Sequence, residues 1–150
     1  MKRLPLLMLL AFLMISNFIM AQDIGLTYKV THYSLDGVNY DDVALKQDIA
    51  LSFYKCSGHP LCFANHWRNA GSQSYGGVYA LQIREIEETS TTYPAVELKF
   101  TWQFFNTYDK VTGRAAVTIT NNYIGNTTKF TAEIVVLETN KVLKLKGYLE

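Results

Sequence analysis

The sequence predicts an all-β protein, built as an antiparallel meander of about seven or eight strands. The composition is rich in residues that favour strands, with ten tyrosines and many Thr, Val and Ile. Apolar and polar residues alternate with period two along several segments, as they do in strands that bury one face. Short runs of turn-forming residues separate these segments, which is typical of hairpins between consecutive strands.

The first half of the chain predicts three strands and one hairpin turn. Leu26, Tyr28 and Val30 begin an alternating segment, and His32 falls on the same face. The pair Asp36-Gly37 is a strong signal for a two-residue hairpin turn. Alternating apolar positions recur in two further segments, which are residues 48–55, with Ile49, Leu51 and Phe53, and residues 78–87, with Tyr79, Leu81 and Ile83.

Residues 59–71 are compatible with two structures. Pro60 suits the first position of a helix and Gly71 the position after its end, so that Phe63, Trp67 and Ala70 would share a face. As a strand, the segment would instead alternate Phe63, Asn65 and Trp67 with Cys62, Ala64 and His66. We expect the helix, near residues 60–70, and at most this one in the chain.

The second half shows the clearest alternation. From Ala95 to Phe105, apolar residues occupy the even positions from Val96 to Phe104, and polar residues occupy the odd positions from Glu97 to Gln103. The same pattern recurs in residues 114–120, 129–137 and 142–149. Turn residues lie between these runs at 109–113, 121–128 and 139–140. So many strands must hide their edges, and either a small closed barrel or a two-sheet sandwich does so. We favour the barrel, because the last four strands are expected to pair in sequence order.

Residues 1–22 have the layout of a secretory signal peptide. Lys2 and Arg3 precede an apolar segment from Leu4 to Met20, which ends at the small residue Ala21. At 17 residues, that segment is at the short limit for a retained membrane anchor. We therefore expect residues 23–150 to form a single β-domain that is exported to the periplasm or the cell exterior, with no membrane span after the signal is removed.

Charge and motifs exclude several functions. Without Lys2 and Arg3, 12 basic residues face 13 acidic ones, and no basic patch suggests a nucleic-acid partner. The sequence lacks a G-x-S-x-G elbow, an H-E-x-x-H helix, a phosphate loop and a dinucleotide fingerprint. We therefore expect that the protein has no cofactor. Of the two classes, we favour a binding module over an enzyme.

The two cysteines, Cys56 and Cys62, allow two interpretations. In an oxidising compartment they are expected to form a disulfide across a short loop. Alternatively, Cys56, His59, Cys62 and His66 are all zinc-ligand types within eleven positions, and would define a metal-dependent module or enzyme. That alternative requires a helix, in which Cys62 and His66 would be one turn apart.

Aromatic residues in the expected loops are the candidate binding residues. Tyr40, Tyr75, Tyr93, Tyr108 and Tyr123 all fall there. Loop Tyr and Trp side chains offer large contact areas at low entropic cost. We expect Trp67, Tyr75 and Tyr108 to bind a small molecule, a glycan or a protein at one end of the barrel. An envelope-associated structural role would suit the same surface.

Two resemblances bear on this expectation. The ending Ala21-Gln22 before Asp23, the segment from Trp102 to Asp109 followed by Gly113, and the closing Gly147-Tyr148-Leu149 resemble small uncharacterised exported β-proteins of Bacteroidota. That resemblance implies export and brings no known activity. Length and strand count are similar to lipocalins in architecture only, since Gly25-Leu26-Thr27-Tyr28 stands in place of their opening G-x-W signature.

Overall fold

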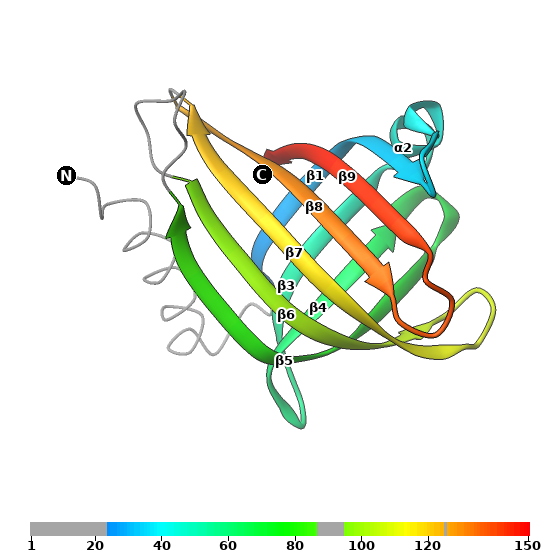
Figure 1. Ribbon diagram of the computed structural model, residues 1–150. Helices are drawn as coiled ribbons and strands as arrows, with labels where there is room; N and C mark the ends of the chain where they lie inside the picture. Colours follow the sequence, from blue (N-terminus) through cyan, green and yellow to red (C-terminus); the bar gives the residue numbers. More distant parts are fainter. Residues whose placement is uncertain (1–23, 87–94, 125) are drawn as a thin grey trace.

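Antiparallel strands make up most of the computed structural model, which describes residues 24–86, 95–124 and 126–150 (Figure 1). One helix, α2, and one 3₁₀ turn, η1, interrupt the strands. The elements in chain order are β1 (Ile24–Leu35), β2 (Val38–Asn39), α2 (Asp41–Gln47), β3 (Ile49–Cys56), β4 (His59–Trp67), η1 (Arg68–Ala70), β5 (Ser72–Ile86), β6 (Ala95–Asn106), β7 (Thr112–Ile124), β8 (Thr127–Val136) and β9 (Val142–Leu149).

The strands form one sheet that closes on itself. From β3 to β9 each strand pairs with the next, β1 pairs with β3, and β9 returns to pair with β1. The short strand β2 lies outside this ring as the second arm of the hairpin that ends β1. Closure leaves no long edge unpaired, which is the advantage of a barrel over an open sheet. The expected meander and barrel are confirmed, and the sandwich is excluded.

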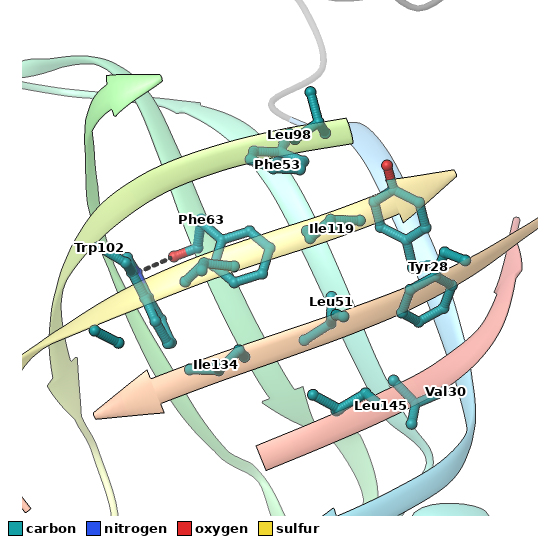
Figure 2. Packing of buried hydrophobic residues seen from close by; sticks show 14 of the residues in the cluster. Tyr28, Val30, Leu51, Phe53, Phe63, Leu98, Trp102, Ile119, Ile134 and Leu145 are labelled. Carbon is teal, nitrogen blue, oxygen red and sulfur yellow. Dashed lines mark hydrogen bonds between the residues drawn. The ribbon is translucent and has the colours of Figure 1, made fainter. Parts of the chain in front are cut away.

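The barrel interior is filled by large apolar side chains. Tyr28, Phe53, Phe63 and Phe130 are fully buried there. Figure 2 shows the rings of Tyr28, Phe53 and Phe63 together with aliphatic residues such as Leu51. In β3, β6, β7, β8 and β9, the buried apolar side chains lie on the strand face that the alternating pattern predicts to point inward. The buried indole of Trp102 donates its Nε1–H to the carbonyl oxygen of Phe63 at 3.0 Å (Figure 2). Burial of this apolar surface stabilises the barrel.

Two bulges change which side chains face inward. The pairing of β1 with β9 shifts between Val30 and His32, so that His32 is exposed and Tyr33 is buried in its place. In β5 the register with β6 shifts between Tyr79 and Gln82, around Ala80 at φ 52°. As a result, Tyr79 lies outside the barrel. The predictions that His32 and Tyr79 share the inner face are therefore wrong, because an extra residue in a strand reverses the alternation after it.

The helix expected near residues 60–70 is not there. Residues 59–67 form β4, which pairs with β3 from His59 to Trp67 and with β5 from Cys62 to Trp67, and the short turn η1 follows it. Pro60 is tolerated because the pairing with β3 is irregular at this point, between Tyr54 and Cys56. Gly71 does end a helical turn, at φ 64°. The short helix is instead α2, where Asp41 accepts hydrogen bonds from the backbone N–H of Tyr33 and from the His32 ring.

A glycine permits the closure of the barrel. Gly147 of β9 lies opposite Val30 of β1, and a Cβ atom at this position would collide with the carbonyl oxygen of Lys29. The same Cβ would also press on the ring of Phe130, at 3.0 Å. Glycine therefore allows β1 and β9 to approach closely at the point where the sheet meets itself.

The expected signal peptide, residues 1–22, and the expected loop containing Tyr93 lie outside the described residues. Within the part of the chain that the structure describes, no helix has the length and apolar character needed to span a membrane.

Candidate functional site

A cavity of about 580 Å³ enters the barrel at the end where α2 and η1 lie. Exposed residues of two turns, Tyr108 and Asp109 after β6 and Lys141 before β9, border its opening. Its inner wall includes the buried side chains of Asn65 and Trp102. We call this space the mouth cavity. Its volume lies in the range of pockets that hold small organic ligands.

Aromatic rings line the mouth cavity from two directions. Tyr33 of β1 and Trp67 of β4 contact edge to face, with ring centroids 6.0 Å apart at 83°. Trp102 and Phe104 of β6 form a second pair, with centroids 4.9 Å apart. The hydrogen bond from Trp102 to Phe63 fixes the indole, and burial raises the pKa of Tyr33, which keeps this phenol neutral. These rings present rigid flat surfaces, which bind an apolar body at little entropic cost.

The remaining walls differ in polarity. Ile134 and Val136 of β8 and Leu143 of β9 form an aliphatic wall. Ser74 and Asn106, on the neighbouring strands β5 and β6, form a polar wall, in which the Asn106 Nδ2 donates to Ser74 Oγ at 2.9 Å. Such a mixed lining suits a ligand with one apolar and one polar side.

Asn65 adds a buried polar atom to this cavity. Its side chain is 7 % exposed, and among the described residues its Oδ1 has no hydrogen-bond partner. On β4 it lies opposite Leu51 of β3 and Ser74 of β5, which places it on the inner face. Buried amide groups are nearly always paired, so this oxygen marks a position where a further group is expected.

Two of the three predicted binding residues meet at this site. Trp67 and Tyr108 both line the mouth cavity, and Tyr108 is 86 % exposed, so its ring is available for contact. Tyr75 belongs to β5 rather than to a loop, and its ring packs against Phe105 on the outer wall with centroids 6.1 Å apart. It therefore does not line the mouth cavity.

Sequence reasoning missed Tyr33, Asn65 and Trp102. A bulge in β1 turns Tyr33 to the inside of the barrel. The alternation of β6 identified Trp102 as inward-facing, but it could not show that the indole borders a cavity rather than the packed core. Asn65 carried a signal, because the strand interpretation of residues 59–67 placed this polar residue between Phe63 and Trp67 on one face.

The four candidate zinc ligands are used in other ways. Cys56 and Cys62 form a disulfide, with Cα atoms 5.9 Å apart, so neither is a free thiol. His59 hydrogen-bonds Tyr79 at 3.2 Å, and His66 Nε2 bonds Ser52 Oγ at 2.7 Å. No group of three or more potential metal ligands occurs in residues 24–86, 95–124 and 126–150. The metal-dependent alternative is wrong for this ligand set, because a disulfide removes the thiolates and strand geometry separates the histidines.

The outer wall carries a second, shallower depression of about 430 Å³ next to His66. Ser52, buried on the outside of β3, and Gln73 of β5 both bond this imidazole, and burial is the main factor that lowers its pKa. His66 is thus held neutral and shields Ser52 from solvent. These contacts account for both polar groups within the wall.

Comparison with known proteins found no matching family model, no matching curated protein and no matching solved structure. A fold class alone does not assign a function, because function resides in the site that the fold carries.

Proposed function

We propose that this chain is an exported, non-catalytic binding protein that takes one small organic molecule into the mouth cavity of its barrel. The observation that carries the proposal is an interior space bordered by two fixed aromatic pairs, Tyr33–Trp67 and Trp102–Phe104. Well-packed protein interiors leave few voids of this size, and those that exist beside aromatic rings commonly hold ligands.

The shape of the site favours a small molecule over a protein partner. The space extends from the exposed turns to side chains such as Trp102 that are almost fully buried, so an occupant must enter the barrel. A protein would instead require an extended outer surface. A glycan would form hydrogen bonds with the polar wall, but it would leave the aliphatic wall of Ile134, Val136 and Leu143 without an apolar partner.

Exposed apolar residues around the opening support the same proposal. Val38, Leu45, Val111 and Leu137 are each at least two-fifths exposed, and they belong to the segments that connect strands at this end. Tyr108, which borders the opening, is a further exposed apolar residue at this end. Exposed apolar side chains near an opening favour contact with an apolar molecule that enters it.

Export is supported by the disulfide and by the signal-like residues 1–22. Disulfides persist outside the cytoplasm, where thiols are not continually reduced. Intact-mass analysis of the protein recovered from each compartment of an expressing cell tests this part, and a full-length cytoplasmic chain with free thiols would contradict it.

A fluorescence titration tests binding. The chain has two tryptophans, Trp67 and Trp102, and both line the mouth cavity, so intrinsic fluorescence reports directly on the site. We expect the neutral probe N-phenyl-1-naphthylamine to quench this emission and to gain fluorescence itself, with a single saturable Kd.

Two single variants localise the probe. Trp67→Ala removes one ring of the Tyr33–Trp67 pair and is expected to raise Kd roughly tenfold, which corresponds to the loss of one aromatic contact surface. Tyr75→Ala is the matched control, because its ring lies on the outer wall, and it should leave Kd unchanged. Absence of saturable binding to the wild-type protein, or equal effects of the two variants, would refute the proposal.

A further inference from the structure

The unpartnered oxygen of Asn65 constrains the chemistry of the ligand. Asn65 is more than nine-tenths buried, it lines the mouth cavity, and its Oδ1 has no donor within the described residues. Removing an amide oxygen from water without supplying a donor is unfavourable. A ligand that brings an N–H or O–H to this position would remove that penalty.

Neighbouring donors are directed elsewhere. The indole N–H of Trp102 donates to the carbonyl oxygen of Phe63, and the amide of Asn106 donates to Ser74. Asn106 Oδ1 meanwhile accepts the backbone N–H of Tyr108 at 2.8 Å, which fixes both the Asn106 side chain and the turn. The polar wall is therefore already organised, and Asn65 Oδ1 remains as an acceptor.

The opposite wall specifies the other side of the ligand. Ile134, Val136 and Leu143 offer only hydrocarbon, while the rings of Trp67 and Trp102 offer flat faces. An occupant that satisfies all of these surfaces is flat, apolar over most of its area and polar along one edge.

We propose that the ligand of the mouth cavity is a flat, amphipathic ring compound that donates an O–H or N–H hydrogen bond to Asn65 Oδ1. This inference rests on the proposed binding function and adds the chemical class of the ligand. A site built around a buried acceptor rejects analogues that lack the donor, because they leave the acceptor unpaired.

A matched pair of probes tests the donor requirement. 2-Naphthol and 2-methoxynaphthalene share a ring system, but only the first carries a hydroxyl donor. Competition against N-phenyl-1-naphthylamine at pH 7 gives Kd for each. We expect the wild-type protein to bind 2-naphthol at least about tenfold more tightly than the methyl ether.

Two variants assign that preference to one residue. Asn65→Leu replaces the amide with an apolar side chain of similar size and should reduce the preference to less than about twofold, mainly through weaker binding of 2-naphthol. Tyr75→Ala, whose ring lies on the outer wall and does not line the mouth cavity, is the control and should keep the wild-type preference. The wild-type comparison stands on its own if Asn65→Leu does not fold.

The outcomes separate this inference from the proposed function. Equal affinities of the two naphthalenes for a wild-type protein that binds N-phenyl-1-naphthylamine would overturn the donor requirement and leave the binding function standing. A preference that persists in Asn65→Leu would overturn the role of Asn65. Failure of all three compounds to bind the wild-type protein would overturn both proposals.

Discussion

Removing the disulfide should lower stability without affecting the binding site. The double variant Cys56→Ser/Cys62→Ser opens a loop whose ends are six positions apart. In the chain-entropy relation, closing a loop of this length reduces the conformational entropy of the unfolded chain, which stabilises the folded protein by about 2.2 kcal/mol at 25 °C. For a domain of this size, that difference corresponds to a fall in Tm of about 8 °C.

Binding should not follow this change in stability. The turn between β3 and β4 lies at the end of these strands opposite to α2 and η1, and no residue from 56 to 62 lines the mouth cavity. The double variant is therefore expected to bind N-phenyl-1-naphthylamine with the wild-type Kd. The coupling of a weak hairpin to a remote site is expected to be small, because each strand remains paired on both sides.

Urea denaturation followed by far-UV circular dichroism measures the stability change. Wild-type protein in excess dithiothreitol should match the double variant, and Ser57→Ala, in the same turn, should unfold like the oxidised wild type. A change below about 0.5 kcal/mol would refute the loop-closure argument. A loss of probe binding at temperatures where the variant is folded would refute the separation of the hairpin from the site.

Three further predictions concern the barrel wall and the core. Burial lowers the pKa of His66 in the folded protein, so the unfolded chain binds a proton at this residue first as pH falls below 6.5. Folding stability should therefore decrease from pH 7 to pH 5. His66→Gln should flatten this part of a plot of urea midpoint against pH, and an unchanged slope would contradict the prediction. Gly147→Ala should destabilise by at least about 2 kcal/mol in thermal unfolding, since its Cβ would meet the Lys29 carbonyl oxygen, whereas exposed Lys146→Ala should have almost no effect. Trp102→Phe should cost about 2 kcal/mol in urea unfolding, because it leaves a buried carbonyl without its indole donor; wild-type stability would show that this hydrogen bond contributes nothing.

Sequence reasoning predicted most of the barrel because alternation is a local property. The pattern from Val96 to Phe104 is uninterrupted, and every inward position of β6 follows from it. The Asp36-Gly37 turn is likewise confirmed, with both residues at positive φ. Prediction failed where the register changed, at the bulges near His32 and Ala80, because no single-residue signal marks an inserted residue.

The segment from His59 to Trp67 shows why local signals can mislead. Pro60 and Gly71 have the spacing of helix ends, and this local preference favoured a helix. In the barrel, β3 pairs with this segment from His59 to Trp67 and β5 pairs with it from Cys62 to Trp67, and a helix would leave the partner groups of both strands unpaired. Pairing on two sides outweighs the weak helical propensity.

The sequence by itself determined the all-β class, the sequential pairing of the last four strands and the inward faces of most strands. Each of these follows from neighbours along the chain or from a count of residues. Only the tertiary structure decided that Trp67 and Tyr108 meet at one opening while Tyr75 lies on the outer wall. It alone revealed that Asn65 lines a cavity, since a cavity is a property of side chains from β1, β4, β5, β6, β8 and β9 together, which closure of the barrel brings into one place.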